Sequence, residues 1–539
     1  MLKDYEIASR ANIKDIKRIA SLSGFREEDM ILYGKSKAKI GKIQTETNKV
    51  GKLVLVTSIN PTPYGEGKTT VAIGLHDGLR KRNVNSMLAL REPSLGPVFG
   101  IKGGACGGGY AQVVPMDEIN LHFTGDFHAI TTANNLICAM IDNVLYHGNS
   151  LDLNEEEIYF TRTMDLNDRA LRNIRVSLGE KERNEKFTIT AACEVMSTLC
   201  MAKDIEDLRT RLDKMIIGKN HKKEFVYVKD LNITGALLAI LKDAIKPNLV
   251  QTLENNPVLI HGGPFANIAP GCNSISATQL ALQNSDITIT EAGFGFDLGG
   301  FKFIDIVSRN NNLTLSGIVL VVTVKALEYN GGDLNNRMES LQKGICNLGA
   351  HMENIEKCQI PYVVTLNKFE SDTEQEIRVI KEYVEARGKT FVINEAFTKG
   401  GEGTLDLAKE VLKLNNQEMH YLYKKENTIK EKIEKVCKEI LHAGKVEYEP
   451  IAEKKIRESQ EEFGELPICI AKTQYSLSDD KNKLGDPRDY TMTVKDIRIY
   501  NGAGFITVYL GNIMTMPGLS KEPAATKIDV DNDTILNIF

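Results

Sequence analysis

The sequence predicts an α/β fold: a P-loop-type, doubly wound and mostly parallel sheet in a large N-terminal domain, followed by two smaller α/β or α+β domains. An apolar run at residues 54–58 leads into a glycine-rich turn that ends in Gly-Lys-Thr, and an amphipathic helical pattern follows. Later apolar runs are also short and end in polar or glycine-bearing residues, as buried parallel strands do at their ligand-binding tips. At 539 residues the chain is too long for one ordinary core.

The first element is expected to be a short helical arm within residues 1–50. Ile13, Ile16, Ile19 and Ala20 are spaced for one buried helix face. The arm therefore precedes the first strand of the predicted sheet.

The turn that begins at Thr62 is predicted to hold the phosphates of ATP. Gly65 and Gly67 permit close approach of the backbone, Lys68 can reach the terminal phosphates, and the Thr69 hydroxyl can sit on Mg²⁺. A complete G-x-x-x-x-G-K-[ST] pattern would need glycine where Thr62 stands. The alternative is a tight strand-to-helix turn with an exposed lysine.

A second short strand is expected at residues 86–90, and Arg91 follows its end directly. Ligands collect outside the carboxyl ends of strands in open α/β sheets, so Arg91 stands where chemistry would occur.

Residues 103–110 are too rich in glycine for a helix or sheet interior. We expect a shaped loop there, either an anion nest or a flexible lid. A plain linker is the alternative, which the aromatic and histidine residues at 122–128 disfavour.

Residues 150–250 show charge and helical spacing with few strand signals, which predicts a helical insertion in the nucleotide domain. Strand signals then return, and each run ends in polar or glycine-bearing residues. The expected parallel strands are residues 257–260, 286–290, 318–324, 361–365 and 391–393, with a helix beginning at Asp372 before the last of them.

The chain is expected to divide into three domains. Residues 1–360 would form the nucleotide domain, with the insertion at about 150–250. Residues 361–455 would form a smaller α/β domain, and 456–539 a C-terminal α+β domain. A charged helical pattern at 429–441 precedes the last unit, whose strands surround a glycine-rich turn at 501–504.

Composition limits the possible partners and location. Lys+Arg 67 against Asp+Glu 72 leaves a net charge of −5 without a basic run, so nucleic acid is not expected as a partner. The start of the chain is charged where a signal peptide is apolar, and the run at 318–324 is far shorter than the roughly 20 residues that span a membrane. Nine cysteines without a C-x-x-C spacing indicate reduced thiols. A soluble, cytoplasmic protein is predicted.

Several of these blocks together resemble the formate–tetrahydrofolate ligase family over essentially the whole chain. The blocks are residues 62–69, 91–97, 99–142, 261–267 and 468–518, and within the last the segment 472–480, Lys-Thr-Gln-Tyr-Ser-Leu-Ser-Asp-Asp, is especially specific. The resemblance implies ATP-dependent joining of formate to tetrahydrofolate through formyl phosphate, giving 10-formyltetrahydrofolate, ADP and phosphate. It also implies a homotetramer stimulated by a monovalent cation, K⁺ or NH₄⁺.

The resemblance also assigns residues to the ATP and formate side. Lys68 would bridge the transferred phosphoryl group, Thr69 would hold Mg²⁺, and Arg91 would grip the acyl phosphate with its two-pronged guanidinium. The remaining implied residues are Thr62, Gly65, Glu66, Gly67 and Thr70 in the phosphate cradle, Gly293 and Phe294 on the adenine side, and Glu92, His122 and Asp126 near the reacting groups. Which of the last three positions formate or takes the amine proton stays open.

Each of these residues also has a structural explanation. Arg91 could form a surface ion pair, Asp126 could cap a helix, and Phe294 could be ordinary core packing. His122 and His128 could both be buried core histidines.

The folate side departs from the family pattern. The family stacks the pterin between a phenylalanine, here Phe369, and a tryptophan, which is replaced by Phe397 in a chain without tryptophan. Stacking on Phe397 would be weaker because phenylalanine has less area and no indole N–H. Further differences occur nearby, at Lys325, Phe296, Gly300, Phe301, Lys368 and Glu370. A paralogue with another amine or pterin acceptor, or a nucleotide-dependent switch that binds a partner, are the alternative functions.

Overall fold

The computed structural model describes residues 2–41, 50–63, 65–100, 106–179, 181–332, 335–511, 513–532 and 534–538. Its main feature is a 12-stranded sheet. Along the main path the strands are β1 (Met30–Tyr33), β2 (Lys37–Ile40), β14 (Asn248–Thr252), β15 (Pro257–Ile260), β4 (Ser86–Leu90), β16 (Ile287–Gly295), β3 (Lys52–Ser58), β17 (Leu315–Val322), β18 (Tyr362–Asn367) and β19 (Phe391–Asn394). All neighbours from β15 to β19 are parallel, which confirms the predicted mostly parallel sheet.

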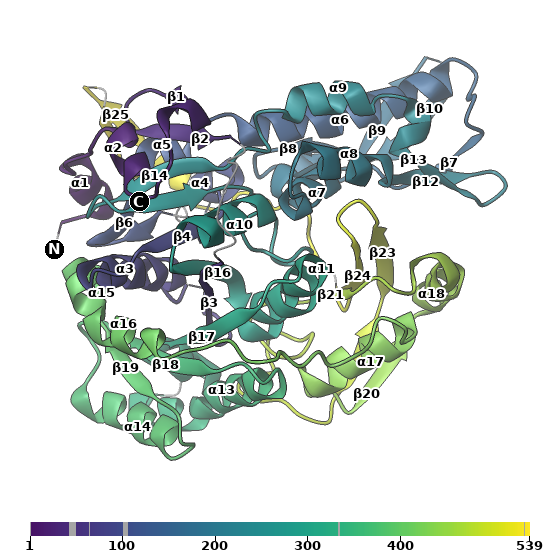
Figure 1. Cartoon of the computed structure of the whole chain (residues 1–539). Coiled ribbons are helices and arrows are strands. Elements are labelled where there is room, and N and C mark those ends of the chain that lie inside the picture. The colour runs from purple at the N-terminus through teal and green to yellow at the C-terminus, as the bar shows by residue number, and fades with distance from the viewer. Residues whose placement is uncertain are drawn as a thin grey trace.

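The central strands are buried on both faces because their alternate residues enter different cores. Leu53 and Leu55 of β3 pack into a core that includes α13 (Arg337–Lys357), while Val54 and Val56 pack with α3 (Lys68–Lys81) and α16 (Leu405–Leu412). Figure 1 shows helices on both sides of these strands. A parallel sheet covered in this way reads as continuous apolar runs, and those runs made the strands predictable.

The N-terminal segment is only partly helical. Helix α2 (Ile16–Ser21) buries Ile16, Ile19 and Ala20 as the spacing predicted, whereas Ile13 is exposed. Strands β1 and β2 then form an antiparallel hairpin that extends the sheet through β14. The prediction of a helical arm is therefore wrong for residues 30–40, which form this hairpin.

The segment at 150–250 is mixed rather than helical. Its helices α7 (Glu194–Met201), α8 (Ile205–Asp213) and α9 (Thr234–Leu241) pack on α6 (Asp126–Tyr146) around a core of their own. It also contains short strands: β7 (Leu153–Ile158), β8 (Arg162–Met164), β9 (Ile174–Leu178), β10 (Lys181–Glu185), β11 (Phe187–Ile189), β12 (Ile216–Asn220) and β13 (Phe225–Tyr227). Several of these strands are charged and only partly buried, so they lack the apolar pattern of core strands. The segment extends to the upper right in Figure 1.

A separate hairpin of β25 (Asp529–Asp531) and β26 (Thr534–Leu536) lies near the C-terminus. The part of the chain before it, residues 429–510, contains two small sheets. Strands β21 (Ile468–Ala471), β24 (Phe505–Tyr509) and β23 (Asp496–Tyr500) form one, with the predicted hairpin between β23 and β24. Strands β20 (Lys445–Tyr448) and β22 (Thr491–Val494) form the other, next to α17 (Ile429–Glu439) and α18 (Pro450–Phe463). In Figure 1 this part lies below the 150–250 segment.

The main sheet continues across residue 360, where the first domain boundary was expected. Strand β17 pairs with β18, and β18 pairs with β19, so the strands of the expected second domain belong to the same sheet as β3. The division into three domains remains a prediction.

All nine cysteines are free thiols. Within the described ranges, no helix has the length and apolar character needed to cross a bilayer.

Candidate functional site

The glycine-rich turn joins the end of β3 to the start of α3, as expected. Gly65 and Gly67 have φ values of +83° and +69°, which side-chain-bearing residues rarely adopt. Gly67 precedes the helix and offers no side-chain cap to the amides of its first turn. A Cβ atom at Gly67 would lie 2.4 Å from Nδ2 of Asn367. The backbone amides in the first turn of α3 are thus available to bind an anion, and position 67 has space only for glycine. Tyr64 lies outside the described residues.

Lys68 is half-buried at the first position of α3, so the alternative of an exposed lysine is wrong. Its ammonium donates to Ser58 Oγ at 3.2 Å, across the turn. Burial lowers the pKa of Lys68, while the carboxylates of Glu291 and Glu66 act in the opposite direction. An ammonium that has lost hydration in this way is suited to an anionic ligand.

Acidic side chains hold the turn in place. The Thr69 hydroxyl donates to Glu291 Oε2 at 2.8 Å, from α3 to the neighbouring strand β16. Glu66 is buried and accepts hydrogen bonds from the Thr62 amide at 2.7 Å and from the Thr323 hydroxyl. The Glu66 carboxylate therefore braces the turn. Sequence reasoning did not single out Glu291, because a glutamate at a strand tip has no local signature.

Arg91 directly follows β4 and faces Gly293, which lies in the irregular last part of β16. A Cβ atom at Gly293 would lie 3.1 Å from Nη1 and 3.3 Å from Nη2 of Arg91. Nε of Arg91 is buried without a hydrogen-bond partner, which does not fit a surface ion pair. The Arg91 charge also lowers the pKa of Lys68. Because a bound anion would relieve the repulsion between these two cations, their electrostatics favour a phosphate-like ligand near Lys68 and Arg91.

Phe294 follows Gly293 in the last part of β16 and has an unusual backbone. Its φ is +63°, and its carbonyl accepts a hydrogen bond from the Ser58 hydroxyl at 3.2 Å. The ring is only partly buried and packs against the main core. A strained backbone at a half-exposed aromatic residue is more typical of a ligand contact than of plain core packing.

Glu92 and Asp126 meet in a buried cluster behind Arg91. Asp126, the first residue of α6, accepts hydrogen bonds from Lys39 Nζ at 2.6 Å and from Asn248 Nδ2 at 2.8 Å. The carboxylate of Asp126 therefore serves a buried ion pair rather than a helix cap. Burial and the Asp126 charge raise the pKa of Glu92 well above its usual range, and Glu92 Oε2 has no hydrogen-bond partner. Lys39, on the unpredicted strand β2, was missed as a partner.

The histidines are placed differently from the expectations. His122 and His128 are both exposed, so the alternative of buried core histidines is wrong. His261 is fully buried, with Nδ1 2.6 Å from Ser274 Oγ and Nε2 2.6 Å from the Ala244 carbonyl oxygen. Burial lowers its pKa to about 4, so His261 is neutral near pH 7.

The two phenylalanines expected at the folate side follow adjacent strands. Asn367 of β18 pairs with Asn394 of β19, and Phe369 and Phe397 come shortly after these positions. Both rings are partly buried. The Lys325 ammonium lies 5.2 Å from the centroid of the Phe369 ring. The structure thus brings both phenylalanines to one edge of the sheet, beside the glycine-rich turn.

The described part of the glycine-rich block packs under Phe397. The Tyr110 amide donates to the Phe397 carbonyl at 2.9 Å, and a Cβ atom at Gly109 would lie 2.0 Å from that carbonyl oxygen. These glycines serve close packing rather than a plain linker. Residues 103–105, for which the anion nest or lid was expected, lie outside the described residues.

Across the described ranges, no cluster of three or more His, Cys, Asp or Glu side chains could hold a metal ion. The family model for formate–tetrahydrofolate ligase matches residues 2–539 of the chain.

Proposed function

Because the chain belongs to the formate–tetrahydrofolate ligase family, we propose that it uses ATP to join formate to N10 of tetrahydrofolate, releasing ADP and phosphate. Formate itself is a poor acylating agent. Transfer of a phosphoryl group to one of its oxygens gives formyl phosphate, from which the amine displaces phosphate. The main support is that the charge of Arg91 acts on the half-buried ammonium of Lys68, while Nε of Arg91 is buried without a hydrogen-bond partner.

The glycine-rich turn fits a nucleotide triphosphate. The uncapped first turn of α3 would bind the phosphates through its amides, and the half-buried Lys68 would neutralise the transferred group. The hydroxyl of Thr69 together with Glu291 would hold Mg²⁺, which favours oxygen ligands and substrate phosphates. Thr62, Glu66 and Thr70 would shape this cradle, and Phe294 with Gly293 would contact the adenine.

Arg91 would bind the acyl phosphate with both terminal nitrogens. Burial and the Asp126 charge raise the pKa of Glu92 and so favour its protonated form, in which it would donate a hydrogen bond rather than act as a base. Asp126 is held by Lys39 and Asn248 and would position Glu92. Exposed His122 is then the candidate for taking the amine proton.

The test is a complete reaction mixture of formate, tetrahydrofolate, Mg²⁺ and ATP, followed for 10-formyltetrahydrofolate. We expect product with the wild type and almost none with Lys68→Met. The exposed Lys35→Met is the matched control and should react like the wild type. Absence of product at saturating substrates would remove the proposal, and so would full activity of Lys68→Met.

The acceptor needs a separate test because Phe397 replaces the tryptophan of the family. If tetrahydrofolate stacks on Phe397, Phe397→Trp should lower its KM and leave the KM for ATP unchanged. Formate-dependent ADP release that does not respond to tetrahydrofolate would favour a paralogue with another acceptor. A partner protein whose binding follows ATP, without any effect of formate, would favour a nucleotide-dependent switch.

The assembly and its surroundings are proposed from the family. We expect a homotetramer in the cytoplasm, with turnover stimulated by K⁺ or NH₄⁺. Size-exclusion chromatography with light scattering and rates measured in each chloride salt test these two points.

A further inference from the structure

A second cavity lies away from the nucleotide turn, between the 150–250 segment and the C-terminal sheet. Its volume is about 520 Å³, within the range of about 300–1,000 Å³ that is usual for small-molecule sites. The walls come from the β7–β8 connection, the start of α7, α18 and the β23–β24 hairpin. None of the residues assigned above to ATP, formate or folate lines it.

Cationic groups gather around this cavity. Its lining includes Lys186, Lys219, Lys455, Lys495 and Arg498. Lys219 is paired with Glu458 at 2.8 Å, and Lys455 with Asp496 at 2.7 Å. Within each pair the two charges cancel. The positive charges of Lys186, Lys495 and Arg498 are therefore in excess.

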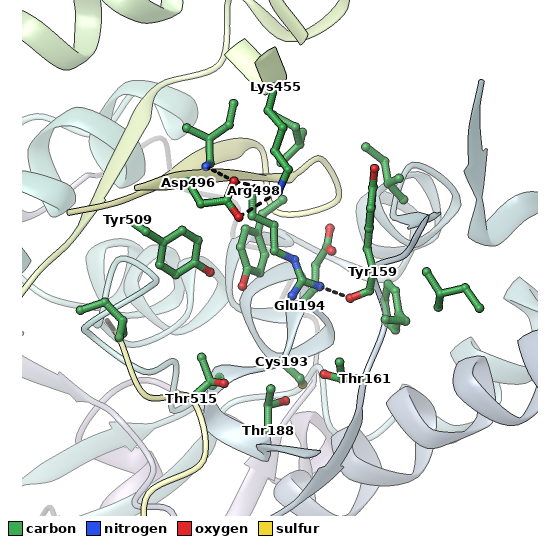
Figure 2. A pocket seen from close by; sticks show the side chains of 18 of the residues that line it. Tyr159, Thr161, Thr188, Cys193, Glu194, Lys455, Asp496, Arg498, Tyr509 and Thr515 are labelled. Carbon is green, nitrogen blue, oxygen red and sulfur yellow. Dashed lines mark hydrogen bonds and ion pairs between the residues drawn. The ribbon is translucent and has the colours of Figure 1, made fainter. Parts of the chain in front are cut away.

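Arg498 and Lys186 act on the same part of the cavity. One terminal nitrogen of Arg498 donates to the Tyr159 carbonyl at 2.9 Å, which fixes the guanidinium as Figure 2 shows. Burial lowers the pKa of Lys186, and the charges of Arg498 and Lys455 lower it further. Cations that repel one another across a cavity are relieved by a bound anion.

Glu194 lies beside Arg498 and is the main opposing charge. It is 3% exposed, and its Oε2 has no hydrogen-bond partner although it lines the cavity. Burial raises the pKa of Glu194 to about 7. Its carboxyl group is therefore substantially protonated near neutral pH, and in that form it can donate a hydrogen bond to an anion.

The rest of the wall is aromatic and aliphatic, with hydroxyl groups at one side. Figure 2 shows Thr161, Thr188 and Thr515 on the side opposite Arg498, with Tyr509 nearby. The apolar lining is Ile158, Phe160, Phe225, Ile497, Ile499 and Tyr500, together with the ring of Tyr159. Such a wall suits a flat, apolar body.

We propose that this cavity is a binding site for a small aromatic carboxylate, with its carboxylate on Arg498 and Lys186 and its ring against the aromatic wall. A carboxylate carried by an aromatic ring fits better than a free phosphate ion, because a phosphate ion would leave the aromatic and aliphatic wall without a ligand surface. The site is independent of the ligase reaction proposed above.

The probe is 2-naphthoate, titrated into the full-length protein. Its fluorescence can be followed directly because the chain has no tryptophan. We expect one saturable site. Affinity should fall roughly tenfold in Arg498→Met and several-fold in Lys186→Met, since each removes a charge-assisted contact. Lys222→Met, an exposed lysine outside the cavity, is the matched control and should bind like the wild type.

Lys186 makes the test robust, because it lies at the exposed rim and its loss does not threaten folding. Unchanged affinity in both cavity variants would overturn the proposal. Equal binding of neutral 2-naphthol would show an apolar surface without carboxylate recognition. Displacement by equimolar phosphate would show a general anion site, and displacement by ATP or tetrahydrofolate would place the probe in the substrate site; either result would also refute it.

Discussion

If Arg91 binds the acyl phosphate as proposed, replacing it by lysine should lower turnover and leave nucleotide binding nearly unchanged. Both terminal nitrogens of Arg91 face Gly293 in the last part of β16, at 3.1 and 3.3 Å from the position of a Cβ atom there. A lysine ammonium can occupy only one of these two positions, so one charge-assisted contact to the transition state is lost. Loss of a preorganised donor of this kind costs about 2.7–4 kcal/mol, which corresponds to about a 10²–10³-fold lower kcat.

The affinity for ATP should change little in Arg91→Lys, because Lys68 and the start of α3 belong to a different part of the chain from β4. Steady-state kinetics gives kcat, and calorimetric titration with a non-hydrolysable ATP analogue gives the affinity. Arg18→Lys, at an exposed position, is the control for the general effect of the exchange. Parallel losses of affinity and turnover would refute the assigned role, as would turnover within about tenfold of the wild type.

Three further substitutions test the packing around the site. Gly67→Ala introduces strain at φ +69° and a 2.4 Å contact, so ATP affinity should fall at least roughly tenfold, whereas Gly388→Ala, at φ +68° with open space, should not change it in the same titration. Lys39→Met leaves the buried Asp126 carboxylate without its cation, which should cost about 3–5 kcal/mol and lower the melting temperature; an unchanged melting temperature would contradict this. Burial raises the pKa of Asp77 to about 7, so the stability gained from its bound proton is present below pH 4 and lost as the pH rises through 7. Asp77→Asn should flatten this decline in melting curves between pH 5 and 8, and equal declines would argue against it.

The sequence predicts best where one local pattern decides the structure. Strands β3, β4 and β15 are continuous apolar runs followed by turn residues, and the structure has them within about two residues of the predicted bounds. The start of α3 was predictable for the same reason, because glycine at position 67 and the apolar residues after it are both local signals.

The missed features depend on partners that are distant in sequence. Lys39 and Asp126 are 87 positions apart, and nothing near either residue indicates the other. Strands such as β10, Lys-Glu-Arg-Asn-Glu, are held by pairing with a neighbouring strand and not by an apolar face, so periodicity does not detect them. His122 and His261 look equally suited to chemistry in the sequence, and only the fold shows that one is exposed and the other buried.

The strand order also explains why substitutions on the acceptor side can leave the nucleotide side unchanged. Three adjacent strands in the middle of the sheet, β4, β16 and β3, carry the nucleotide side: Arg91 follows β4, Gly293 lies near the end of β16, and the glycine-rich turn follows β3. Phe369 and Phe397 follow β18 and β19, which are separated from β3 by β17.

Hydrogen bonds join the two sides: Asn367 Nδ2 donates to the Glu66 carbonyl at 3.2 Å, and the Thr404 hydroxyl donates to the Gly74 carbonyl of α3 at 2.6 Å. Lys368 and Glu370, where the sequence is expected to depart from the family pattern, come directly after Asn367. Phe397, which is proposed to contact the acceptor, is farther along the chain than Asn367. A substitution at Phe397 should therefore leave the glycine-rich turn unchanged. For that reason we expect this chain to differ from other members of the family in its response to tetrahydrofolate and not in its binding of ATP.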